Sequence, residues 1–173
     1  MNTRLAPDNS GDYTTLEQMT GTPVPANAVT IFVRLDKGQF IIAPMHVNAA
    51  GIYYEQREAR VILDPTAEEL GIAFRNAFNT FSAKDEDLRD GRKSDWPAYR
   101  ASGMQSVSQF ERGYCRIFCG ALNSANVIVR ASAAHPQLAD VELSIPFNPA
   151  SAEDVGKRIL QLIDAIWALR QPS

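Results

Sequence analysis

The chain has 173 residues, of which 45% are hydrophobic and 21% charged, a composition typical of a globular domain. Its 20 acidic and 17 basic residues give a net charge of −3, which disfavours a nucleic-acid-binding protein because such proteins need a basic surface. Two cysteines are too few for a disulfide framework, and no apolar run approaches the ~20 residues of a membrane span. We therefore expect a cytoplasmic protein that binds neither nucleic acid nor membranes.

Residues 1–28 are rich in Thr, Pro, Asn and Gly and show no sustained period, so we expect an irregular lead-in without a signal-peptide core. A single α+β domain is predicted over 29–173. It consists of two halves, 29–81 and 113–170, joined by a connector over 82–112.

The first half begins with three predicted strands. Val29–Leu35 is β-branched and aromatic, and a hairpin turn at Gly38 leads to a second strand, Gln39–His46, which is expected to fade at Pro44. The third, Ile52–Leu63, carries several charges, which suggests an edge or a face open to water.

A long helix is predicted over 67–81. Thr66 has the side chain of an N-cap and Glu69 lies three residues later, which is the pattern of a capping box. Apolar residues then recur at helical spacing and predict one buried stripe. They are Leu70, Phe74, Ala77, Phe78 and Phe81.

The connector divides into three parts. Residues 84–93 are charged and predict a solvated loop. Ser94–Gly103 predicts a short helix that begins at an N-cap serine and stops at a glycine. Ser106–Arg112 is ambiguous between strand and loop.

The second half repeats the plan of the first. Strands are predicted at Tyr114–Cys119, Asn126–Ser132 and Leu138–Phe147, with a turn at Leu122–Ala125. A last helix is predicted over 152–169 because apolar residues recur there at helical spacing.

The start of the first helix recurs at the start of the last. Ser151 and Asp154 repeat the cap, and Gly71 and Gly156 occupy the same offset, which suggests close packing of each helix against the sheet. The fold class that follows is α+β, with pseudo-duplicated βββα halves. It has a mostly antiparallel sheet of about six strands and two long helices on one face.

The sequence shows no known catalytic or phosphate-binding motif, and we predict no cofactor and no metal site. Cys115 and Cys119 would share one face of a strand and are expected to be small buried hydrophobes. An alternative is an enzyme or small-molecule-binding domain with a pocket between sheet and helices near Cys119, His135 or His46.

The connector is the candidate partner-binding site, because long loops inside a compact domain are commonly functional. It combines acidic side chains with two aromatic residues, a mixture that suits a protein interface. The alternative is that the aromatic side chains plug one end of the core. The candidate residues are Asp85, Glu86, Asp87, Asp90, Asp95, Trp96 and Tyr99.

Five segments stand in a characteristic order and spacing. They are Thr66–Gly71, Lys93–Trp96, Gly103–Glu111, Val141–Phe147 and Ser151–Gly156. Together they resemble the immunity proteins of bacterial contact-dependent growth inhibition, the CdiI family, over about residues 50–165.

The resemblance implies a non-enzymatic cytoplasmic protein that binds the C-terminal toxin domain of a cognate CdiA effector, commonly a nuclease. It implies no catalytic residues, and toxin-contacting surfaces vary within the family. We expect the free protein to be a monomer. A scaffold or adaptor without a toxin partner is a third interpretation.

Overall fold

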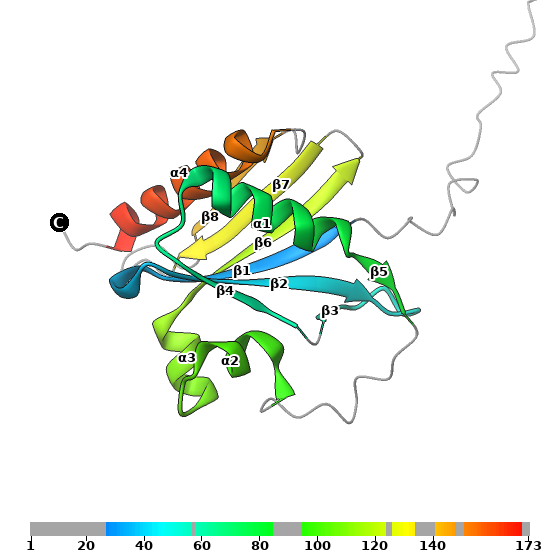
Figure 1. Ribbon diagram of the computed structural model, residues 1–173, viewed down its shortest axis with the longest axis horizontal. Coiled ribbons are helices and arrows are strands. Elements are labelled where there is room, and N and C mark those ends of the chain that lie inside the picture. Colours follow the sequence, from blue (N-terminus) through cyan, green and yellow to red (C-terminus); the bar gives the residue numbers. More distant parts are fainter. Residues whose placement is uncertain are drawn as a thin grey trace, which may run out of the picture.

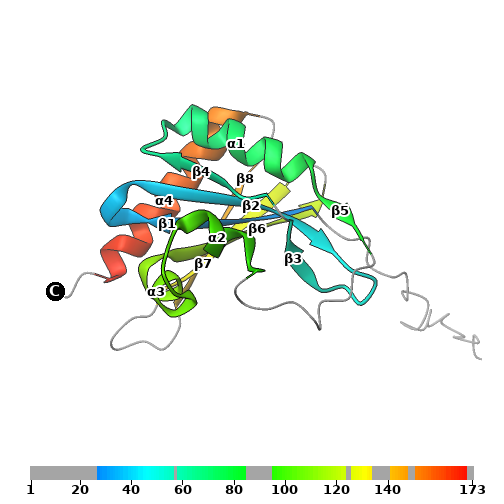
Figure 2. The same cartoon turned by 60° about the horizontal axis from the view of Figure 1, so that its bottom comes forward.

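The computed structural model has the mixed α+β architecture that the sequence predicts, built on a single sheet (Figure 1). Two long helices, α1 (Ala67–Asn79) and α4 (Ala152–Arg170), lie side by side on one face of the sheet. Two short helices, α2 (Pro97–Ser102) and α3 (Val107–Gly113), lie on the other face (Figure 2). The structure describes residues 27–56, 58–84, 95–123, 126–133, 141–147 and 151–170.

The predicted lead-in over 1–28 falls almost entirely outside the described residues. Within the described ranges, no helix combines the length and the apolar character that crossing a membrane requires.

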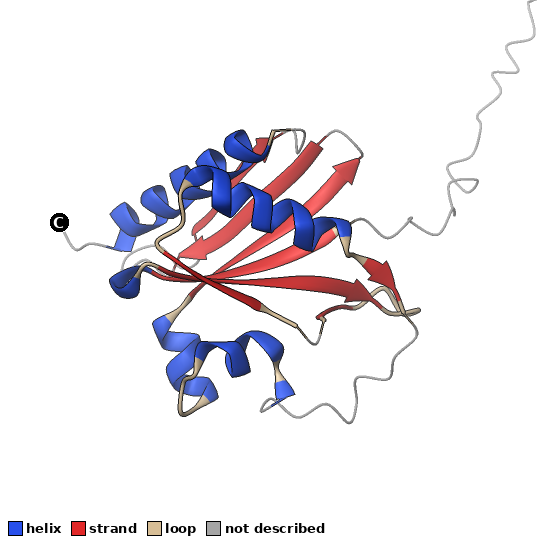
Figure 3. Ribbon diagram, in the orientation of Figure 1, coloured by secondary structure: helices blue, strands red, loops and turns tan. Residues whose placement is uncertain are grey.

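The sheet has the strand order β3-β2-β1-β6-β7-β8, and the short strands β4 and β5 also pair with β2 (Figure 3). Every described strand pair is antiparallel except β2 with β5, so the prediction of a mostly antiparallel sheet is confirmed. The strands are β1 (Ala28–Arg34), β2 (Gln39–Val47), β3 (Tyr53–Glu55), β4 (Arg60–Leu63), β5 (Ser82–Ala83), β6 (Cys115–Asn123), β7 (Asn126–Ala133) and β8 (Val141–Phe147).

The two halves meet at the centre of the sheet, where β1 pairs with β6 and Ile31 lies opposite Ile117. Outward from this pair, β2 and β4 follow on one side and β7 and β8 on the other. Each half then ends in a long helix, which confirms the predicted pseudo-duplicated plan of strands followed by a helix, with four strands described before α1 in the first half and three before α4 in the second.

The repeated capping segments start the two long helices as predicted. The Thr66 hydroxyl accepts a hydrogen bond from the Glu69 N–H at 3.2 Å, and the Glu69 carboxylate accepts one from the Thr66 N–H at 2.9 Å. This reciprocal pair is a complete capping box. At the start of α4, the Ser151 hydroxyl accepts from the Asp154 N–H at 3.3 Å.

Gly71 and Gly156 each lie against the other long helix and not against the sheet, contrary to the prediction for them. A Cβ on Gly71 would overlap the backbone carbonyl of Ala152, and a Cβ on Gly156 would overlap that of Ala67. The close packing is therefore between the two helices, and the expectation that each glycine packs against the sheet is wrong. A backbone-to-backbone approach of this kind requires the missing side chain at both positions.

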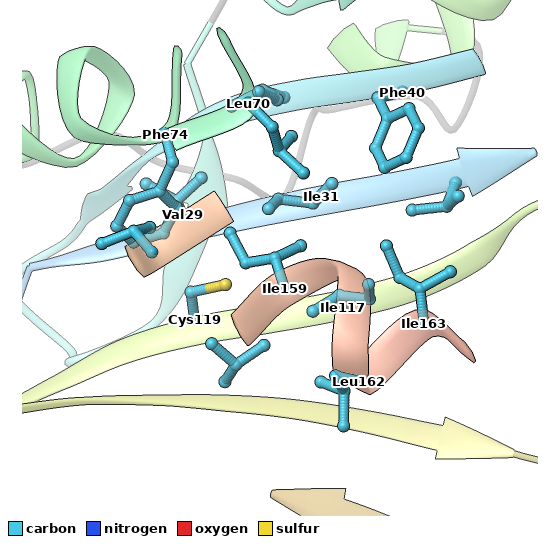
Figure 4. Close-up of a cluster of buried hydrophobic side chains, with 14 of the residues drawn as sticks. Val29, Ile31, Phe40, Leu70, Phe74, Ile117, Cys119, Ile159, Leu162 and Ile163 are labelled. Carbon is cyan, nitrogen blue, oxygen red and sulfur yellow. The ribbon is translucent and has the colours of Figure 1, made fainter. Parts of the chain in front are cut away.

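The main core fills the space between the sheet and the two long helices (Figure 4). Ile31 and Ile117 project from the central strands toward Leu70 and Phe74 of α1 and Ile159 of α4, and all five are fully buried. The predicted apolar stripe of the first helix is confirmed, except that α1 ends before Phe81.

Two strand predictions in the first half are wrong. The second strand does not fade at Pro44, because β2 continues to Val47 and pairs there with β3. The third predicted strand is in fact two strands, β3 and β4, which pair with different parts of β2. Gln56 fixes the break between them, since its amide nitrogen donates to the carbonyls of Met45 at 3.2 Å and Thr80 at 2.8 Å.

The connector is more helical than predicted. The predicted N-cap Ser94 lies outside the described residues, and α2 begins after Trp96 with a proline in its first turn. It ends at Gly103 in the left-handed conformation, as predicted. The segment expected to be strand or loop is helix α3, because the Ser106 hydroxyl caps it by accepting from the Gln109 N–H at 3.2 Å. In the second half, Leu122 and Asn123 belong to β6 rather than to the predicted turn.

Candidate functional site

The face of the sheet opposite α1 and α4, here called the open face, is only partly covered. Alternate residues of β6 divide between the two sides: Ile117 and Cys119 join the main core, and Arg116 and Phe118 point the other way. The short helices α2 and α3 cover the part of the open face around Phe32. The remainder of β6 and β7 presents side chains that no described helix covers.

The aromatic residues of the connector attach α2 and α3 to the open face. The Trp96 ring lies edge-on to Phe32 at 5.4 Å and to Phe110 at 4.9 Å, measured between ring centroids. The Tyr99 ring lies 6.1 Å from Phe110. Phe32, Ile41, Ala43, Ala98, Phe110 and Tyr114 form a second core between the open face and the two short helices. Trp96 and Tyr99 are both partly buried against this second core, so part of each side chain is available to a partner and part holds the connector in place.

Glu55 of β3 ties the start of α2 to the sheet. Its carboxylate accepts a hydrogen bond from the Ala98 N–H at 3.0 Å and another from the Trp96 indole. Burial raises the pKa of Glu55, although these hydrogen bonds and the charge of Arg116 act in the opposite direction. The sequence placed this charge in a strand open to water, and the structure corrects that expectation. No local pattern could indicate the burial of Glu55, because its hydrogen-bond donors, Ala98 and Trp96, lie far from it along the chain.

The acidic residues of the candidate site are not all placed by the structure. Asp85, Glu86, Asp87 and Asp90 lie outside the described residues. Asp95 is exposed and immediately precedes Trp96. The structure therefore brings together Asp95, Trp96 and Tyr99 at the start of the connector helix, and their role in binding a partner stays a prediction.

A hollow of about 150 Å³ lies on the open face beyond the connector helices. Tyr53 of β3 forms one wall, with its ring edge-on to Phe118 of β6 at a centroid distance of 6.1 Å. The hollow is much smaller than the ~300–1,000 Å³ of small-molecule sites, so its size suits a single side chain. No local pattern in the sequence indicates this hollow. Its lining residues are Ala28, Tyr53, Phe118, Gly120, Ala121, Ile128 and Arg130.

The thiols lie in the main core, as predicted. Cys115 and Cys119 are both buried and neither forms a disulfide, and they lie on the side of the sheet that α1 and α4 cover. Burial raises the pKa of the Cys119 thiol far above its ordinary value, so this thiol stays protonated and is a poor nucleophile. His135, its proposed partner in the alternative interpretation, lies outside the described residues.

The other histidine makes a contact that the sequence did not indicate. His46 is nearly buried, and its Nδ1 shares a hydrogen bond of 2.7 Å with the Ser82 hydroxyl across β2 and β5. The Tyr54 ring lies 5.4 Å from it. Among the described ranges, no group of three or more His, Cys, Asp or Glu residues is arranged to hold a metal ion.

No family model matches the sequence, and no curated protein matches it. Solved structures with the same fold do exist. One is a protein of unknown function from Neisseria meningitidis, with a TM-score of 0.64 and 15% identity, covering 81% of this chain and 94% of that one.

Another is a chain of the CdiA-CT/CdiI toxin and immunity complex from Yersinia pseudotuberculosis. It has a TM-score of 0.60 and 8% identity, and the likeness covers 82% of this chain and 97% of that one. At these identities the likeness is one of fold. The sheet and helices described above are thus similar to those of a toxin–immunity complex component.

Proposed function

We propose that this chain is an immunity protein that binds and neutralises the C-terminal toxin domain of a cognate contact-dependent growth inhibition effector, CdiA. The observation that carries the proposal is the fold shared with a chain of the CdiA-CT/CdiI complex over 82% of this chain. The order and spacing of the capped helix starts, connector and last strand in the sequence support it independently.

The chemistry of the described residues also favours a binding surface. Both thiols are buried, burial raises the pKa of Cys119 so that it stays protonated, and the hollow on the open face is too small for a typical substrate. By contrast, the connector presents Asp95 beside the partly exposed Trp96 and Tyr99. Aromatic anchors in a polar surround are typical of protein interfaces.

We assign the connector the leading role in recognition. Its acidic residues, including Asp85 and Asp87, would steer a basic toxin cleft and form charge pairs with it, which mainly raises the association rate. Trp96 and Tyr99 would add apolar contact from a fixed position, because the second core already holds them. The toxin would be a nuclease, and the complex would form in the cytoplasm of the cell that receives it.

Growth rescue tests the proposal directly. Candidate cognate CdiA toxin domains are expressed in cells with or without this chain, and we expect growth in the presence of the cognate toxin only when this chain is also present. Failure of rescue, together with failure of the two proteins to co-purify, would contradict an immunity function.

Charge removal tests the connector through the measured affinity of this chain for the toxin domain. Asp85→Asn and Asp87→Asn are expected to weaken toxin affinity and to reduce its dependence on salt. Asp164→Asn is the matched control, since it makes the same change at an exposed position of α4, on the side of the sheet opposite α2 and α3. Equal affinities for the three variants would mean that the connector is not the binding site.

A further inference from the structure

We infer that the hollow on the open face receives an apolar side chain from an acidic segment of the toxin domain, with Arg130 pairing with a neighbouring carboxylate of that segment. The inference rests on the proposed function and assigns it a second contact region, of opposite charge to the connector.

The shape of the hollow favours one apolar side chain. Phe118 and Ile128 come from adjacent strands, and Tyr53 closes one side. Gly120 lies opposite Ile128 and carries no side chain, and a Cβ there would come within 3.1 Å of the Phe118 ring. The missing methyl group leaves room in which another molecule's side chain can contact the ring.

The charge at the rim favours a carboxylate. Arg130 lines the hollow directly opposite Phe118, and Arg116 lies two residues from Phe118 on the same face of β6. Both side chains are exposed. Glu55, whose pKa is lowered by the nearby charge of Arg116 but raised overall by burial, already accepts hydrogen bonds from Ala98 and Trp96. Arginine suits this role because its planar guanidinium can bind both oxygens of a carboxylate.

The hollow and the connector lie on one continuous surface. From Tyr114, the C-cap residue of α3, the residues facing the open side continue along β6 through Arg116 and Phe118 to Gly120. Six residues of strand span about 20 Å, which is within the width of a standard protein interface. A single toxin domain can therefore contact both regions at once.

Charge reversal at the rim is the first test. Arg130→Glu is expected to weaken binding of the cognate toxin domain at least about tenfold by isothermal titration calorimetry, because it removes a charge pair and adds repulsion. Arg130→Lys is expected to retain most of the affinity. Arg158→Glu on α4 is the matched control, with the same charge change on the opposite side of the sheet, and is expected to have no effect.

Loss of apolar contact is the second test. Ile128→Ala shortens a side chain that lines the hollow, and we expect a several-fold loss of affinity. Ile72→Ala makes a comparable truncation at a position of α1 that is 45% exposed, and should leave affinity unchanged. Thermal unfolding of each free variant shows whether a loss of binding exceeds any loss of stability.

The outcomes separate this inference from the proposed function. If the unaltered chain binds the toxin and rescues growth, but Arg130→Glu and Ile128→Ala bind as tightly as their controls, the hollow is not a contact and the inference fails alone. If the unaltered chain does not bind the toxin, both fail. If sedimentation shows that Arg130→Glu disrupts a dimer, a second copy occupies the hollow and the inference is overturned.

Discussion

Gly71 of α1 and Gly156 of α4 each lie against the first residue of the other's helix. The missing side chain of Gly71 faces the Ala152 carbonyl, and that of Gly156 faces the Ala67 carbonyl. The contact between α1 and α4 is thus formed by both copies of the duplicated segment, one from each half of the chain. This reciprocity gives a physical reason for the recurrence of a glycine at a helical position where it costs about 1 kcal/mol relative to alanine.

Alanine at either glycine is expected to destabilise the protein. Gly71→Ala or Gly156→Ala inserts a methyl group into a backbone contact and forces the helices apart, at a cost of about 1–3 kcal/mol that outweighs the gain in helix propensity. Urea unfolding measures the difference. The double variant should lose less than the two single losses combined, because the first methyl group already separates the helices.

Gly113→Ala is the matched control for this prediction. A Cβ there would meet only the end of the flexible Met104 side chain, at 3.1 Å, and the position is exposed. A near-neutral result is expected. Equal destabilisation at Gly71 and Gly113 would show that the helix crossing is not the reason.

The sequence predicted the fold through local signals. Caps such as Thr66 with Glu69, and the glycine stop at Gly103, act within a few residues and were read correctly. The neighbour of Gly71 was not predictable, because spacing shows that something packs closely but not which element does. The break at Gln56 was missed for the same reason, since its bonds to Met45 and Thr80 depend on the assembled sheet.

Removal of the cap of α1 should weaken the fold modestly. Thr66→Ala deletes the hydroxyl that accepts from the Glu69 N–H, and we expect a loss of about 1 kcal/mol in the free energy of unfolding. Thr66→Ser keeps the hydroxyl and serves as the control. A loss of similar size with serine would point to packing of the methyl group instead of the cap.

Glu69 is the other half of the capping box, and its contribution to stability should depend on pH. Hydrogen bonds from the Thr66 backbone and side chain lower the pKa of Glu69 below 4.5. The stabilisation from the ionised carboxylate is therefore complete above pH 4.5 and is lost as the pH falls through the depressed pKa. The stability advantage of the unaltered chain over Glu69→Gln should shrink in acid, as urea unfolding at several pH values can measure. An advantage that grows in acid would contradict this.

Glu55 should show the opposite dependence on pH. Burial raises its pKa above 4.5, so the folded chain holds a proton that the unfolded chain has released. Its contribution to stability is fully present below pH 4.5 and declines as the pH rises through the folded pKa. Relative to Glu55→Gln, the unaltered chain should lose stability as the pH rises above 4.5. A relative gain over that range would mean that hydrogen bonds, not burial, dominate.

Glu55→Ala should be more damaging than Glu55→Gln at neutral pH. Alanine leaves the Ala98 N–H and the Trp96 indole without this acceptor, which costs about 1–3 kcal/mol where such donors are buried. Glutamine keeps an acceptor oxygen. Equal stability of the two variants would show that the tie between β3 and α2 contributes little.

The candidate site was only partly predictable from sequence. Trp96 and Tyr99 were proposed because aromatic residues beside charges in a long connector suit a protein interface, and their role in binding stays a prediction. Phe118 and Arg130 were not proposed, since each is an ordinary member of an alternating strand and only the register of β6 and β7 places them opposite each other. Tyr53 reaches them through the turn after β2, a long-range contact that no local pattern records.

The buried thiols should resist modification and contribute nothing to toxin neutralisation. Cys115 and Cys119 lie in the main core and burial raises the pKa of Cys119, so iodoacetamide should label neither in the native protein and both in concentrated guanidinium chloride. Ser108→Cys, at an exposed position of α3, is the positive control for labelling. Cys119→Ala should preserve growth rescue even if it lowers the unfolding midpoint. Loss of rescue with an unchanged midpoint would instead make the thiol a functional group and favour the enzyme interpretation.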